Sequence, residues 1–78
     1  MTDALILWTI YNHPRDFPNH FVVRPFAVMR GTPEPIAYAF CCLYPSLTAA
    51  RRDCQRNGAN ACLSREPGDD VNIIETWL

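Results

Sequence analysis

Lysine is absent from this sequence of 78 residues, and all seven basic residues are arginine. We interpret this bias as the mark of a GC-rich coding genome rather than as selection for the paired hydrogen bonds that guanidinium groups donate to carboxylates and phosphates. Eight acidic residues bring the formal net charge to -1. The chain therefore lacks the positive charge behind long-range attraction to a nucleic-acid backbone, and we predict no direct binding to nucleic acid.

Long apolar runs are missing as well. No segment approaches the roughly 20 apolar residues that a membrane-spanning helix needs. A secretory signal is also not expected, because Asp3 stands where such a signal carries positive charge, and Trp8, Thr9 and Tyr11 interrupt its would-be apolar segment. We therefore predict a cytoplasmic protein that does not associate with membranes.

The chain is short for a stable domain. A domain of this size buries only about 60% of the surface that its unfolded chain exposes, so a homodimer or another partner could add to its stability. The apolar fraction of 49% is nevertheless too high for a disordered tail. We predict one folded domain over residues 1–78.

The alternation of apolar residues predicts four strands, over residues 4–11, 20–29, 36–43 and 71–78. Between the last two strands, Ser46 is a suitable helix N-cap and Asn57-Gly58 a suitable helix end, so one helix of about three turns is expected. The segment 59–67 is weakly patterned and predicts no element. The order β-β-β-α-β indicates an α+β fold, a small antiparallel sheet with one main helix packed on one face.

Two features of the first two strands stand out. The segment 11–24 contains Pro14 and Pro18, which predict a stiff, ordered loop instead of a tight hairpin turn. Pro25 lacks a backbone N–H, so it predicts an edge position or a bulge in the second strand.

The four cysteines do not form a metal-binding pattern. The sequence has no Cys-x-x-Cys, and the adjacent Cys41 and Cys42 would point to opposite faces of a strand. We predict no metal and no cofactor, with free thiols of which Cys54 lies in the core and Cys62 is the most exposed. Cys62 could form an intermolecular disulfide under oxidising handling, which we interpret as an artefact rather than as regulation.

The loop between the first two strands carries the most concentrated polar chemistry. His13, Asp16 and His20 could form a small catalytic or metal-binding set, and this stays an alternative. The interpretation that we favour is non-enzymatic, because a stiff loop that exposes His13, Arg15 and Asp16 can bind another protein at a low ordering cost.

The C-terminal part is locally acidic. Asp69 and Asp70 belong to a turn that begins at Gly68, Glu66 shortly precedes it, and alternation places Glu75 on the strand face of Val71, Ile73 and Trp77. Such a run can be a solvated turn, or, with Asp16 nearby, a patch that stands in for phosphates and engages a basic groove. We therefore predict a partner-binding surface made of His13, Arg15, Asp16, Glu66, Asp69 and Asp70.

The segments LWTIYNHPRDFP (residues 7–18), FVVR (21–24), DDV (69–71) and ETWL (75–78) resemble a group of short uncharacterised proteins from proteobacteria and their phages. In size and phage context the chain is similar to the anti-CRISPR inhibitors, small domains that bind a Cascade or Cas effector directly, several of them by mimicking DNA. The resemblance implies an inhibitor that blocks a CRISPR effector complex. An oligomeric structural module, paired through a sheet edge or through Cys62, is a further alternative.

Overall fold

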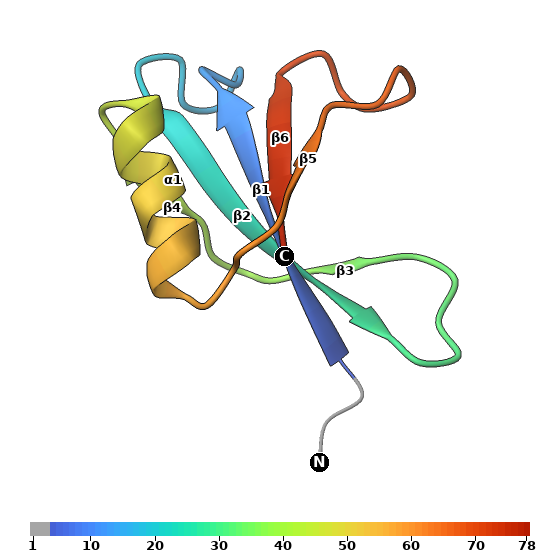
Figure 1. Cartoon of the computed structure of the whole chain (residues 1–78). Coiled ribbons are helices and arrows are strands. Elements are labelled where there is room, and N and C mark those ends of the chain that lie inside the picture. Colours follow the sequence, from blue (N-terminus) through green and yellow to red (C-terminus); the bar gives the residue numbers. More distant parts are fainter. Residues whose placement is uncertain (1–3) are drawn as a thin grey trace.

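The computed structural model describes residues 4–78, which form a sheet of six strands with one helix packed against one face (Figure 1). All strand pairs are antiparallel, so the predicted α+β class is confirmed. The helix and strands are α1 (Leu47–Arg56), β1 (Ala4–Asn12), β2 (Phe21–Met29), β3 (Ile36–Ala37), β4 (Cys42–Tyr44), β5 (Cys62–Ser64) and β6 (Ile73–Trp77).

The first strand lies in the middle of the sheet. The strand order is β3-β2-β1-β6-β5, and β4 also pairs with β2. β1 and β2 pair without interruption from Ala4 opposite Met29 to Asn12 opposite Phe21. A strand with neighbours on both sides suits the β-branched and aromatic run of β1, because side chains on both faces find packing partners.

The single strand predicted over residues 36–43 is wrong, and Pro25 explains why. Two short strands, β3 and β4, pair with β2 on either side of this residue, at 26–27 and 21–23. The backbone N–H of Tyr38 donates to the Pro25 carbonyl at 3.1 Å, so the backbone of Pro25 faces this edge of β2. Because proline has no N–H to offer there, the neighbouring strand breaks while β2 itself continues.

The end of the chain also departs from the prediction. β5 was not expected, and it pairs with β6 from Cys62 opposite Trp77 to Ser64 opposite Glu75. β6 begins only at Ile73, since residues 71–72 belong to the preceding turn. Between β1 and β6 the register shifts by one residue, a β-bulge that leaves Ile74 without an opposite residue.

This bulge changes which side chains share a face. Ile74 and Trp77 pack against the core under the helix, whereas Ile73 lines a groove on the other face of the sheet. The prediction that Ile73, Glu75 and Trp77 share a face is therefore wrong for Ile73. One extra residue shifts the alternation of every residue before it.

Both ends of α1 match the sequence-based expectation. The Ser46 side chain accepts a hydrogen bond from the backbone N–H of Ala49 at 3.1 Å, which caps the first turn. At the other end, Gly58 has a positive φ of 95°, and its N–H donates to the Gln55 carbonyl. The Ala59 N–H donates to the Cys54 carbonyl, so the helix ends in a Schellman motif.

The core lies between α1 and the sheet. It is small, with partly buried aromatic side chains around its rim, as expected for a domain of this length. The ten residues of α1 form no membrane-crossing segment, and no helix within residues 4–78 is long and apolar enough for one. The buried members of the core cluster are Ile10, Val23, Ala50, Cys54 and Ala59.

Candidate functional site

The two faces of the sheet differ in how they are covered. Trp8 and Ile10 of β1 pack under α1, on the face that we call the helix face. Leu7, Thr9 and Tyr11 alternate with them and lie on the opposite face, which we call the open face because no helix of residues 4–78 covers it. Figure 1 shows α1 on one side of the sheet only. The open face therefore offers sheet surface that α1 leaves uncovered.

A groove of about 370 Å³ runs over the middle of the open face. Its floor is mainly apolar, and two acidic side chains stand at its rim, Glu34 from the β2–β3 turn and Asp69 from the turn before β6. Neither carboxylate has an ion-pair partner among residues 4–78. The groove is lined by Leu7, Thr9, Tyr11, Phe26, Glu34, Pro35, Asp69, Ile73 and Thr76.

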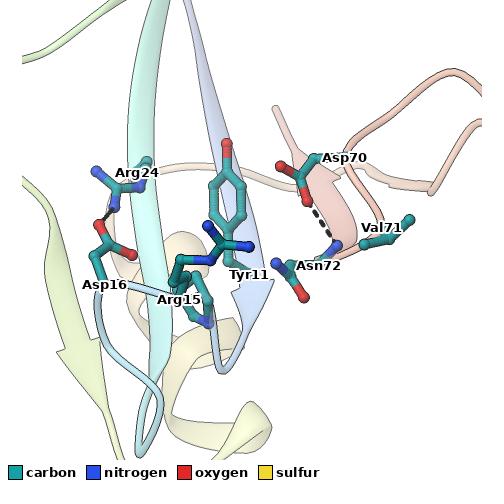
Figure 2. Close-up of a pocket in the computed structure, with 8 residues that line it drawn as sticks. Tyr11, Arg15, Asp16, Arg24, Asp70, Val71 and Asn72 are labelled. Carbon is teal, nitrogen blue, oxygen red and sulfur yellow. Dashed lines mark hydrogen bonds and ion pairs between the residues drawn. The ribbon is translucent and has the colours of Figure 1, made fainter.

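A second, larger hollow of about 760 Å³ adjoins the groove at Tyr11, and we call it the cleft. The loop of residues 13–20 forms one wall, and the turn before β6 forms the other (Figure 2). In Figure 2, Asp16 and Arg24 lie on one side of Tyr11 and Asp70 and Asn72 on the other. The cleft is lined by Tyr11, Pro14, Arg15, Asp16, Arg24, Asp70, Val71 and Asn72.

The charges in the cleft are of both signs. Arg24 donates a hydrogen bond to Asp16 and forms an ion pair with it, and its guanidinium carbon lies 5.6 Å from the centroid of the Tyr11 ring. Asp70 accepts a hydrogen bond from the backbone N–H of Asn72 at 2.9 Å. Arg15 makes no hydrogen bond or ion pair with residues 4–78. Of the two guanidinium groups in the cleft, the one on Arg15 is therefore available to a ligand.

Tyr11 forms the shared boundary of the groove and the cleft. Burial raises the pKa of its hydroxyl above the ordinary value, the Arg24 charge opposes this shift, and the carboxylates of Asp70, Asp69 and Asp16 add to it. The phenol therefore stays protonated at neutral pH, where it can donate a hydrogen bond.

The structure brings together half of the six residues predicted to bind a partner. Arg15, Asp16 and Asp70 line the cleft, and Asp69 lines the groove beside it. His13 and Glu66 line neither hollow.

The two residues outside the hollows have local roles. The backbone N–H of His13 donates to the His20 carbonyl and closes the loop, while its ring meets Phe21 edge-on with centroids 4.8 Å apart. The Glu66 N–H donates to the Asp69 carboxylate at 3.0 Å, and the Asp69 N–H returns a bond to the Glu66 carbonyl. These contacts shape the loop and the turn that form the walls of the cleft.

Sequence reasoning missed Tyr11, Arg24 and Asn72. Tyr11 and Arg24 could have been placed on the open face by extending the strand alternation to the ends of β1 and β2. For Asn72 the sequence carried no signal, since the bulge next to it changes the alternation.

The residues of the alternative set, His13, Asp16 and His20, do not form a metal site. Within residues 4–78, no three side chains from His, Cys, Asp or Glu lie close enough together to hold a metal ion, and this includes His13, Asp16 and His20. No disulfide is present among the cysteines: Cys54 is buried and Cys62 is exposed, as predicted.

Glu75 has a role that the sequence did not suggest. Its side chain is 8% exposed and lies on the helix face, where Arg51 of α1 donates two hydrogen bonds to it and the Trp77 indole N–H a third at 2.7 Å. This carboxylate belongs to the contact between helix and sheet, not to the acidic surface around Asp69 and Asp70.

Comparisons with protein-family models, with curated proteins and with solved structures gave no match to this chain.

Proposed function

We propose that the protein is a binding module that engages another protein through its open face. The observation that carries this proposal is the one-sided cover of the sheet. Because α1 covers only the helix face, apolar side chains of the open face stay in contact with water. Val71 lines the cleft, Leu63 lies opposite the groove residue Thr76, and Leu5 shares the face of Leu7 by alternation. Leu5 is 49% exposed, Leu63 is 55% exposed and Val71 is 83% exposed. Exposed apolar side chains next to a groove with a polar rim are typical of protein interfaces.

The charges around the groove favour a particular kind of partner. Glu34 and Asp69 stand at its rim without ion-pair partners in the described part of the chain. An apolar anchor flanked by basic side chains complements such a groove, since opposite charges across an interface steer association and reject wrong partners.

A narrower form of the proposal takes the partner to be a CRISPR effector complex, as the sequence resemblance implies. The protein would then act as an inhibitor that occupies a basic groove in place of DNA. In this form, Glu34 and Asp69 supply the acidic contribution, because Asp16 is already paired with Arg24. No catalytic step belongs to this proposal.

A pull-down of the tagged protein from cells carrying a CRISPR effector, analysed by mass spectrometry, tests both forms. Leu63→Asp and Glu34→Arg change exposed side chains of the open face, and each should lower partner recovery at least about tenfold, equivalent to 1.4 kcal/mol. Met29→Asp and Glu66→Arg are matched controls, because Met29 lies on the helix face and Glu66 lines neither hollow.

The outcomes separate the two forms. Recovery of the effector that depends on Leu63 and Glu34 but not on Met29 and Glu66 supports the narrower form. A different partner with the same dependence supports the binding module but rejects the effector. Equal losses in all four variants, or in none, reject the open face as the binding surface.

A homodimer is a second candidate, and the free edge of β5 favours it. Ala61 and Leu78 exchange two backbone hydrogen bonds. Alternation therefore turns the N–H and carbonyl groups of Cys62 and Ser64 away from β6, toward an edge where no other strand of residues 4–78 pairs. Light scattering under reducing conditions should then give twice the monomer mass, and a monomer at micromolar concentration would reject this candidate.

A further inference from the structure

The cleft contains two side chains of opposite charge that do not bond to each other. Arg15 has no hydrogen-bond or ion-pair partner among residues 4–78. Within the same residues, the Asp70 carboxylate accepts a hydrogen bond only from the neutral backbone N–H of Asn72. The remaining charges, on Asp16 and Arg24, neutralise each other. The cleft therefore offers one cation and one anion for a ligand to neutralise.

Arg15 and Asp70 both belong to turns that backbone hydrogen bonds fix. Arg15 follows the buried Pro14, whose carbonyl accepts from the Phe17 N–H at 2.9 Å. The Asp70 carbonyl accepts from the Ile73 N–H at 3.0 Å and from the Arg65 side chain at 3.3 Å. A ligand that contacts both side chains therefore loses little free energy to the ordering of the two cleft walls, because the turns that carry Arg15 and Asp70 are already formed.

The Tyr11 ring lies between the two walls of the cleft (Figure 2). Tyr11 also lines the apolar groove. A polypeptide segment that follows β1 along the groove reaches the cleft when it passes Tyr11. If the segment ends there, its terminal carboxylate meets a guanidinium group, which binds carboxylates through paired hydrogen bonds. A basic side chain on the same terminal residue can lay its alkyl stem on the ring and place its charge at Asp70.

We propose that the cleft binds the C-terminal residue of a partner polypeptide when this residue is basic, with Arg15 binding the carboxylate and Asp70 the side-chain cation. This inference rests on the proposed protein binding at the open face and names the chemical group that the partner presents. It also differs from the sequence-based prediction of a patch that stands in for phosphates, because Arg15 becomes a primary contact for an anionic group of the partner.

The test titrates the isotope-labelled full chain with three small molecules of similar size and follows the backbone amide signals by NMR. N-acetyl-lysine carries both the carboxylate and the cation, N-acetyl-lysinamide carries the cation alone, and N-acetyl-norleucine carries the carboxylate alone. We expect saturable shifts at Asp16, Val71 and Asn72 with N-acetyl-lysine, and binding at least about fivefold weaker, near 1 kcal/mol, with each single-charge compound.

Two variants assign the contacts. Arg15→Gln should reduce the affinity for N-acetyl-lysine to the affinity that the wild type has for N-acetyl-lysinamide. Asp70→Asn, which keeps an acceptor for the Asn72 N–H, should reduce it to the affinity that the wild type has for N-acetyl-norleucine. Arg52→Gln is the control, because Arg52 lies on the exposed side of α1. Equal binding of N-acetyl-norleucine and N-acetyl-lysine, unchanged binding in Arg15→Gln, or no saturable shift would overturn the proposal.

Its failure can be told apart from failure of the proposed function. Leu63→Asp should lower capture of the protein partner at least about tenfold while N-acetyl-lysine still binds, because Leu63 does not line the cleft. A partner that is captured through Leu63 and Glu34, combined with no binding of N-acetyl-lysine, would leave the binding module standing and reject the C-terminal residue as its ligand.

Discussion

Arg51 of α1 and Glu75 of β6 form a two-point hydrogen-bonded ion pair across the contact between helix and sheet. Nε and one terminal nitrogen of Arg51 each donate to a different carboxylate oxygen at 2.9 Å. The carboxylate side is buried, whereas the Arg51 side chain is 45% exposed. The pair therefore fixes α1 on the sheet without removing the guanidinium from water, which limits the desolvation cost that makes fully buried ion pairs expensive.

Removal of Arg51 should destabilise the protein. Arg51→Ala leaves the Glu75 carboxylate on the helix face without its guanidinium partner, although the hydrogen bond from the Trp77 indole stays, so the free energy of unfolding should fall by about 1.5–3 kcal/mol. Urea unfolding followed by tryptophan fluorescence measures this loss. Arg52→Ala, one residue along the same helix but on its exposed side, should change the stability by less than about 0.5 kcal/mol. Equal effects of the two substitutions would show that the ion pair contributes nothing specific.

The same pair predicts how stability depends on pH. The hydrogen bonds from Arg51, followed by that from Trp77, hold the pKa of Glu75 below its ordinary value of 4.5, although burial opposes this. A carboxyl group whose pKa is lowered in the folded state contributes its full stabilisation at pH values above the pKa that it has in the unfolded chain. This stabilisation is lost as the pH falls through the pKa that the group has in the folded protein.

The free energy of unfolding should therefore decrease as the pH falls below about 5, and Glu75→Gln should show a smaller decrease over the same range. Urea unfolding at a series of pH values measures both. Identical pH profiles for the two proteins would exclude Glu75 as a source of the acid sensitivity.

The cysteines should differ in reactivity. Burial raises the pKa of the Cys54 thiol to about 12, so Cys54 should not react with iodoacetamide at pH 8 until the protein unfolds. Cys62 is exposed, but burial of its sulfur and then the Glu75 charge raise its pKa, so it should react, more slowly than it does in the urea-unfolded chain. Mass spectrometry of timed samples distinguishes the two sites by their peptides. Faster alkylation of Cys54 than of Cys62 in the folded protein would contradict this order.

Gly58 should be required at the end of α1. Its positive φ of 95° is a conformation that residues with a Cβ adopt at a cost, so Gly58→Ala should lower the free energy of unfolding by about 1 kcal/mol even though the space around it is open. Gly68→Ala is the matched control, because Gly68 has neither a positive φ nor a close neighbour. Thermal unfolding compares the two, and a similar melting temperature for Gly58→Ala and the wild type would refute the requirement.

Much of the site depended on contacts that no local pattern carries. The sequence indicated a stiff loop and an acidic turn, and both exist, but their meeting at Tyr11 depends on β1 pairing with β2 on one side and β6 on the other. The sequence analysis placed Asp16, Glu66, Asp69 and Asp70 on one binding surface and Glu75 on a strand. In the structure, Asp16 is paired with Arg24, Asp69 joins the groove, and Glu75 is bound by the helix.

The sequence by itself determined the features that depend on neighbouring residues. These are the alternation along β1, the helix start at Ser46, the helix end at Gly58 and the absence of regular pairing around Pro14 and Pro18, because capping, side-chain alternation and proline geometry act within a few residues.

Only the tertiary structure decided the features that depend on strands far apart in the chain. In the sequence, Pro25 indicated either an edge position or a bulge in its own strand. In the structure, the strand beside β2 is interrupted at Pro25 and divides into β3 and β4. The bulge at Ile74, the pairing of β5 and the partner of Glu75 likewise follow from which strand lies beside which. Register and hydrogen-bond direction are properties of a pair of strands, so a single strand's sequence does not contain them.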